Sequence, residues 1–275
     1  MWLTLKALGR MLQFVMHLFW GMALALWLQL QLGEEWHQQP RGRATICRWL
    51  RQLAHILGLH THLSCDRVTN TGPVLLVANH ISWLEIVAIG SLRPIRFLAK
   101  DDVRSWPLIG TLVALGGTLF IHRHSNSALR RTQADLAQAL GAGQNVLIFP
   151  EGTTTDGSRV ERFRPALFEA ARSARRPIQP VAISYRCGSA PDPIAPFIGD
   201  DGFVQHLWRI LRRADTHLYL HFCEPLDSGE MRQALAHSSR ECISAALAAT
   251  PPQAAESEDC DAIQNGRCAR IDTPR

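Results

Sequence analysis

Short apolar runs alternate with helical patterns between about residue 66 and residue 250. The runs are continuous and do not alternate with polar residues, which is the pattern of strands covered on both faces of a sheet. We expect strands at residues 74–78, 95–99, 118–122, 146–149, 178–184 and 217–222. Helical stretches fall at residues 83–91, 127–140, 162–174, 203–213 and 229–249. This order predicts an α/β fold with a mostly parallel or mixed central sheet flanked by helices.

The N-terminal part of the chain has a different pattern. Residues 11–32 are apolar apart from three glutamines and His17, and roughly 20 helical residues can cross a bilayer core. Residues 43–58 place apolar and basic side chains at helical spacing, as in an amphipathic helix that lies among lipid headgroups. The two stretches predict a membrane-anchoring helical hairpin within residues 1–62.

Two topologies remain open for this anchor. Lys6 and Arg10 precede the apolar run and Glu34 and Glu35 follow it, which places the start of the chain in the cytoplasm. A single crossing would then carry the rest of the chain outside. A hairpin dipped into one leaflet leaves the folded domain, residues 63–250, on the cytoplasmic face of the inner membrane, and we expect this arrangement. Residues 251–275 are polar and are expected to be a disordered tail.

The positive charge of the chain comes almost entirely from arginine. Its formal net charge is +5 and its pI about 9.0, while the lysines are Lys6 and Lys100. A basic surface suits an anionic membrane or a nucleic acid. The chain shows no zinc-finger spacing and no aromatic RNA-binding signature, so we expect a membrane partner and no nucleic acid. The seven cysteines are scattered without a CxxC pair, which predicts free thiols and no metal site.

A strand that ends in a histidine is the first segment with candidate chemistry. Residues 73–85 read PVLLVANHISWLE, so a buried strand ends at Asn79-His80 and a helix follows, with Ser82 as its expected N-cap. Such switch points are where α/β proteins place reactive groups. Glu85 on the first helical turn can fold back beneath the imidazole of His80, hold its tautomer and stabilise the imidazolium. The pair is typical of a general base for a hydroxyl, although a histidine near a glutamate is also an ordinary polar contact.

Two further segments offer groups that bind anions and hydroxyls. Residues 145–157 read NVLIFPEGTTTDG, and a turn of this composition exposes backbone N–H groups to an anion. Glu151 in that turn can accept hydrogen bonds from substrate hydroxyls; the alternative is a solvated turn. Arg123 follows the strand expected at 118–122, where a guanidinium is well placed for a phosphate.

Together these segments resemble the glycerolipid acyltransferase family typified by 1-acylglycerol-3-phosphate acyltransferases. The family's first block, His, four residues and Asp, is similar to His80 through Glu85 in this chain. Its second, Phe-Ile-x-Arg, matches residues 120–123, and its third, Phe-Pro-Glu-Gly-Thr, matches residues 149–153. A fourth, a proline in a later strand, matches Pro180. The resemblance covers about residues 72–184, with the blocks in order.

The resemblance implies a role for each matching residue. His80 would deprotonate the acceptor hydroxyl, and Glu85 would orient it in place of the usual aspartate, with one methylene more. Arg123, Glu151, Gly152 and Thr153 would bind the phosphate and glycerol region of the acceptor. Lys100 opens a linking stretch that is also similar to the family, and it is a further substrate-binding candidate. Neither a metal nor a resident cofactor is implied.

The implied function is O-acyl transfer in membrane-lipid synthesis. The donor would be acyl-CoA or acyl carrier protein, and the acceptor the free hydroxyl of a lysolipid. We expect 1-acylglycerol-3-phosphate, which would give phosphatidic acid. The bacterial look of the blocks leaves lyso-ornithine lipid open as the acceptor. A different class also stays open, because a His–carboxylate pair can activate water and so make a lipid thioesterase or hydrolase.

Overall fold

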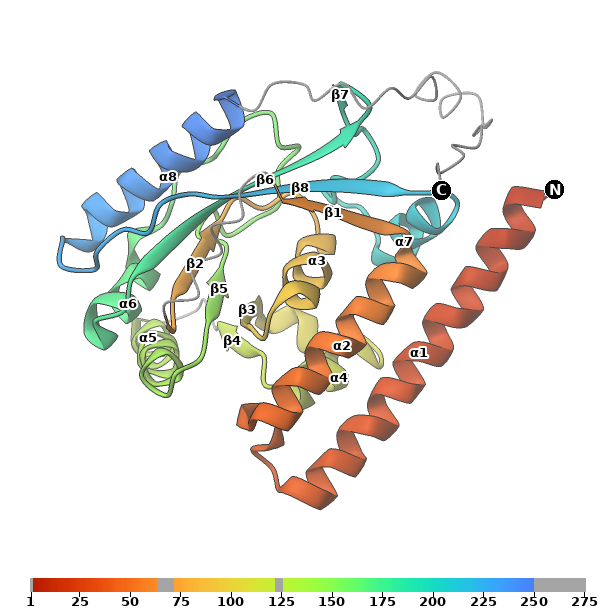
Figure 1. The fold of residues 1–275 in the computed structure, drawn as a ribbon, viewed down its shortest axis with the longest axis horizontal. Coiled ribbons are helices and arrows are strands. Elements are labelled where there is room, and N and C mark those ends of the chain that lie inside the picture. Colours follow the sequence, from red (N-terminus) through yellow and green to blue (C-terminus); the bar gives the residue numbers. More distant parts are fainter. Residues whose placement is uncertain (1, 64–71, 122–125, 250–275) are drawn as a thin grey trace, which may run out of the picture.

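A mixed β-sheet forms the centre of the protein (Figure 1). The computed structural model describes residues 2–63, 72–121 and 126–249. Within these ranges the strand order is β1-β8-β6-β2-β5-β3-β4, and β7 pairs with β6. The strands are β1 (Leu59–Leu63), β2 (Leu75–Ala78), β3 (Arg96–Lys100), β4 (Leu119–Ile121), β5 (Val146–Ile148), β6 (Ile178–Cys187), β7 (Ala190–Pro191) and β8 (Thr216–Phe222).

The middle of the sheet is parallel. Strand β2 lies between β5 and β6, and it runs parallel to both. All side chains of β2 and β5 are buried, because helices cover both faces of the sheet, and this explains their unbroken apolar sequence. Strands β6 and β8 pair in the antiparallel direction. The predicted mixed α/β sheet is therefore confirmed.

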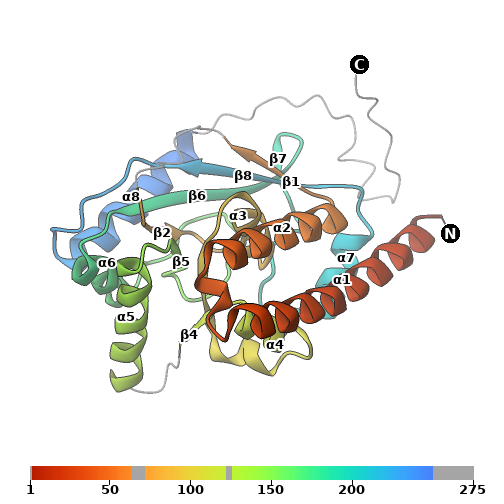
Figure 2. The ribbon, with the colours of Figure 1, turned by 60° about the horizontal axis from the view of Figure 1, so that its bottom comes forward.

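Helices form a layer on each face of the sheet (Figures 1 and 2). They are α1 (Trp2–Leu32), α2 (Pro40–Leu57), α3 (Leu84–Leu92), α4 (Ile109–Leu115), α5 (Asn126–Gly141), α6 (Glu169–Ala174), α7 (Phe203–Leu211) and α8 (Arg232–Ala249). One apolar core joins α1, α2, α3 and α7 to the sheet. A second core on the opposite face joins α5, α6 and α8 to it. Alternate residues of β2 separate the two cores: Leu76 and Ala78 belong to the first, Leu75 and Val77 to the second.

Helices α1 and α2 form an antiparallel hairpin beside the sheet (Figure 1). From its sequence pattern, α2 is expected to turn its apolar side toward lipid, but that side packs against the protein. Its apolar side chains Leu50, Leu53 and Leu57 are buried in the first core, since α2 packs directly on α3. Gly90 makes the close approach possible: a Cβ there would lie 2.4 Å from Leu50 Cδ1.

Helix α1 has one protein-facing side and one exposed apolar side. The protein-facing side includes Arg10, whose guanidinium donates to the carbonyls of Ile56 (2.9 Å) and Leu211 (3.0 Å) at the ends of α2 and α7. The opposite side exposes the following large apolar residues: Leu5, Leu8, Leu12, Met16, Phe19, Trp20, Leu26, Trp27 and Leu30. The part of α1 from residue 4 to residue 32 is long and apolar enough to cross a membrane. Among the described residues, no other helix meets this condition.

Several local expectations need correction. Strand β1 and helix α4 were not predicted, because their short sequences lack a clear period. The helix expected at 162–174 is a 3-10 turn, Pro165–Phe168, followed by the short α6. Cys187 is disulfide-bonded, contrary to the expectation of free thiols, whereas Cys47 and Cys242 are free. The expected tail at 251–275 lies outside the described residues.

Candidate active site

The turns that follow β2 and β5 meet at one edge of the sheet. Val77 of β2 is in register with Ile148 of β5, and the two strands run parallel, so their carboxyl ends open side by side. The turn after β2 carries His80, and the turn after β5 carries Glu151, Gly152 and Thr153. The sheet therefore brings together two sequence blocks that lie about 70 residues apart.

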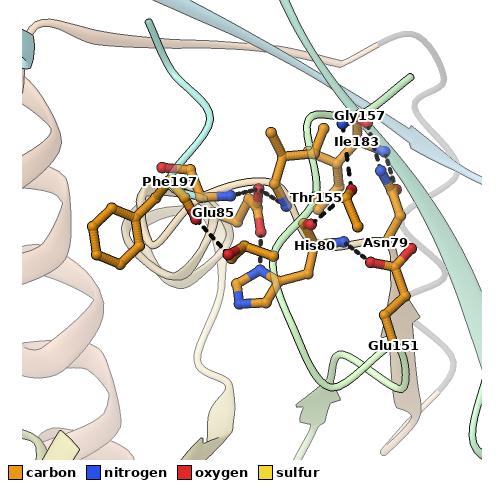
Figure 3. Close-up of polar contacts among 11 residues, drawn as sticks. Asn79, His80, Glu85, Glu151, Thr155, Gly157, Ile183 and Phe197 are labelled. Carbon is orange, nitrogen blue, oxygen red and sulfur yellow. Dashed lines mark hydrogen bonds and ion pairs between the residues drawn. The ribbon is translucent and has the colours of Figure 1, made fainter. Parts of the chain in front are cut away.

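A short hydrogen bond joins His80 to Glu85 (Figure 3). The distance from His80 Nδ1 to Glu85 Oε2 is 2.6 Å, and the glutamate side chain is fully buried while the imidazole is partly exposed. The other carboxylate oxygen, Oε1, accepts from the backbone N–H groups of Ile81 (2.8 Å) and Ser82 (2.6 Å). Because Nδ1 points at the carboxylate, Nε2 is the nitrogen that faces away from Glu85 (Figure 3).

The longer side chain of glutamate fits this turn without loosening the pair. Glu85 sits in the first turn of α3 and reaches back to the residues before the helix. Its carboxylate accepts from two N–H groups at the start of the helix, which is the task of a cap. The expected N-cap, Ser82, is therefore a donor to Glu85 through its backbone, and Trp83 occupies the N-cap position without a side-chain cap bond.

The turn after β5 holds the backbone of His80 from both sides. Glu151 Oε2 accepts from the N–H of His80 (3.2 Å), and the N–H of Thr155 donates to the carbonyl of His80 (2.8 Å). The ring of Phe149 stacks on the imidazole, with centroids 3.9 Å apart and planes 12° apart. Within this block, which was expected to bind substrate, Phe149, Glu151 and Thr155 contact His80.

Asn79 bonds the same turn to strand β6, a role that was not predicted from the sequence. Its side-chain amide donates to the carbonyl of Ile183 (2.9 Å) and accepts from the N–H of Ile183 (2.8 Å). The asparagine thus extends the pairing of β2 with β6 by one rung after the backbone has turned away. A polar residue at the end of a fully buried strand was the available signal.

A cavity of about 910 Å³ lies beside this edge of the sheet. His80, Lys100, Gly152 and Thr153 line it, together with apolar side chains of α1, α2, α3, β3 and α4. Arg123 lies outside the described residues. Among the residues that the structure describes, no group of three or more His, Cys, Asp or Glu side chains is arranged to hold a metal ion.

The residue Glu151 is 4% exposed. Burial raises the pKa of Glu151 to about 7, although the hydrogen bonds from the N–H groups of His80 and Glu161 oppose the shift. A site with a His–carboxylate pair, a histidine nitrogen free of that pair and an adjoining apolar cavity can transfer a proton beside a long apolar substrate.

Comparisons with known proteins define the class of this chain. The family model described as Acyltransferase matches residues 61–184. A lyso-ornithine lipid O-acyltransferase of Pseudomonas aeruginosa is 40% identical over 84% of this chain and 89% of its own length. A 1-acyl-sn-glycerol-3-phosphate acyltransferase of Neisseria gonorrhoeae is 34% identical over 64% of this chain and 69% of its own length.

A solved structure shares the fold. The 1-acyl-sn-glycerophosphate acyltransferase PlsC of Thermotoga maritima superposes with a TM-score of 0.62 over 90% of this chain and 98% of its own, at 18% identity. The chain belongs to the acyltransferase family. More particularly, it is an acyltransferase of lysolipids and associates with the membrane. The resemblance found in the sequence blocks is thereby confirmed.

The raised pKa of Glu151 predicts how stability depends on pH. The folded-state pKa of about 7 exceeds the ordinary value of 4.5, so this group stabilises the fold fully below about pH 4.5, and the contribution is lost as the pH rises through 7. Glu151→Gln removes the titration. As the pH rises from 5 to 7, the free energy of unfolding of the wild type should therefore fall by roughly 1–3 kcal/mol relative to that of the variant. Between pH 7 and 8 the difference between the two proteins should stay nearly constant. A difference that is the same at every pH from 5 to 8 would contradict the raised pKa.

Proposed function

We propose that His80 is the general base of an O-acyltransferase and that Glu85 orients it. The observation that carries this proposal is the 2.6 Å bond between His80 Nδ1 and a fully buried carboxylate, in a turn that borders the cavity. The bond favours the Nδ1–H tautomer, which leaves a lone pair on Nε2 for a hydroxyl proton. The buried carboxylate then stabilises the imidazolium that forms.

The transfer needs one proton to move from oxygen to sulfur. His80 Nε2 takes the proton of the acceptor hydroxyl as its oxygen bonds to the thioester carbonyl carbon. The carbon–sulfur bond breaks, and the thiolate leaves with the proton that the imidazolium returns. The products are an ester and a free thiol, and the histidine is regenerated. Acyl-CoA and acyl carrier protein are both donors of the required thioester.

Lyso-ornithine lipid is the acceptor that the comparisons favour. The relative at 40% identity carries that name and is matched over 89% of its length, and a Rhizobium meliloti relative of the same name is 36% identical over 71% of its own. The phosphate-bearing acceptor expected first from the sequence, 1-acylglycerol-3-phosphate, has support from the relative at 34%. We therefore propose lyso-ornithine lipid first and lysophosphatidate second.

The cavity has an apolar part that suits an acyl chain and polar groups that suit the head of the acceptor. Apolar side chains of the hairpin and of α4 suit an acyl chain, with Phe14, Leu18 and Leu112 among them. Lys100, Gly152 and Thr153 line the same cavity as His80, and we propose them as contacts of the acceptor's polar region. Arg123 is proposed as a further contact on the strength of its sequence block alone.

We propose that the hairpin lies in one leaflet, with the catalytic domain in the cytoplasm. Helix α1 packs along α2, α4 and α7, so only its outer side is available to lipid. If α1 spanned the bilayer, the exposed Arg41 and Arg48 of the neighbouring α2 would enter the hydrocarbon, which is costly. A helix lying flat leaves them in the headgroup region, close to a cytosolic thioester donor.

Acyl transfer by membranes that contain the wild type or His80→Ala tests the function. Labelled acyl-CoA and acyl carrier protein are supplied in turn, with lyso-ornithine lipid or lysophosphatidate. We expect the two-chain product with the wild type and a loss of at least 10²-fold in His80→Ala, because general base catalysis contributes about that much or more. Free fatty acid as the sole product would favour hydrolysis, and a fully active His80→Ala would exclude His80 as the base.

The depth of α1 tests the topology. An encoded fluorophore replaces Leu5, Met16 or Leu30 in vesicles whose lipids are brominated at defined positions. These residues share the exposed side of α1, so a helix lying in one leaflet should place all three labels at the same depth. In a spanning helix with a rise of about 1.5 Å per residue, Met16 would lie far deeper than the other two, and that result would contradict the hairpin.

A further inference from the structure

Glu151 is a second buried carboxylate at the site, beside Glu85. The proposed function assigns it no role. Its sequence block implied a contact with the acceptor. We propose that Glu151 is a positioning residue, which fixes the backbone of His80 and does not touch the acceptor. This inference rests on the proposed role of His80 as the base.

The side chain of Glu151 is directed away from the cavity. Its neighbours Pro150, Gly152 and Thr153 all line the cavity, whereas Glu151 does not. Figure 3 shows its carboxylate at the backbone of His80, on the side opposite the imidazole. With 4% of the residue exposed, an acceptor hydroxyl has no path to it in this arrangement.

Both oxygens of the carboxylate already accept backbone hydrogen bonds. Oε2 accepts from the N–H of His80 and Oε1 from the N–H of Glu161, each at 3.2 Å. In its ionised form, which predominates above about pH 7, the carboxylate is an acceptor only and satisfies both backbone donors. Glu151 therefore ties the turn of His80 to the loop that follows its own turn.

The contacts of His80 together leave its ring little freedom. Glu151 holds the N–H of His80, Thr155 holds its carbonyl through N–H (2.8 Å) and through its hydroxyl (3.3 Å), and Glu85 holds Nδ1. Fixing the peptide groups on both sides of the Cα atom sets the direction in which Nε2 points. A displacement of about 1 Å at a reacting atom can reduce the rate by 10²-fold.

Glu151→Gln is the variant that separates positioning from binding. The amide retains one acceptor and turns the other into a donor, so one of the two backbone N–H groups loses its partner and faces an NH₂ group. The turn must then shift, while no contact with the acceptor is lost. Glu161→Gln is the matched control, because that carboxylate is partly exposed and pairs with Arg159 on the surface.

Steady-state kinetics with membranes containing each variant decide the proposal. We expect Glu151→Gln to lower kcat by 10- to 100-fold while the KM for the acceptor stays within about twofold of the wild type, and Glu161→Gln to match the wild type. A raised KM with an unchanged kcat would show that Glu151 binds the acceptor. An unchanged kcat and KM would also overturn the proposal.

Two further variants keep the result interpretable. If Glu151→Gln does not fold, Glu151→Asp takes its place: it keeps both acceptors but is too short to reach both donors, so kcat should fall and KM should not. His80→Ala is assayed in parallel. If it is as active as the wild type, the proposed function fails; if it is inactive while the Glu151 variants raise only KM, positioning alone fails.

Discussion

The buried carboxylate of Glu85 is the group around which the site is organised. It is fully buried yet bonded to three donors: the imidazole of His80 and the N–H groups of Ile81 and Ser82. A buried carboxylate without such partners would be strongly destabilising. The turn between β2 and α3 therefore has to adopt the one conformation that supplies all three donors, and this conformation also directs the histidine toward the cavity.

The parallel sheet also brings the segment after β5 against that turn. Because β2 and β5 are neighbours, the segment from Phe149 to Thr155 lies directly against His80. Asn79 then secures the turn to β6 through both backbone groups of Ile183. Removing that amide would leave two buried backbone groups unpaired, each worth about 1–3 kcal/mol. The rigidity of the site thus comes from side chains that bond to backbone.

The sequence predicted the alternation of strands and helices and the pairing of His80 with Glu85, because both depend on local pattern and on short spacing. It did not predict that α2 would bury its apolar side against α3, since an amphipathic helix has the same sequence pattern beside a protein core as beside lipid. Nor could it separate the roles of Glu151 and Gly152: adjacent residues in a turn point in different directions, and only the fold shows which one faces the cavity. The acyltransferase class followed from the order of the blocks, whereas the choice of acceptor depends on side chains brought together from several elements.

The central claim is that Glu85 holds His80 as the Nδ1–H tautomer with Nε2 open to the acceptor. Nitrogen NMR of ¹⁵N-histidine-labelled protein, with the His80 signals assigned by comparison with His80→Ala, measures this directly. The account predicts a protonated Nδ1 and an unprotonated Nε2 in the resting enzyme, and loss of that preference in Glu85→Gln. A proton found on Nε2 in the wild type would contradict it.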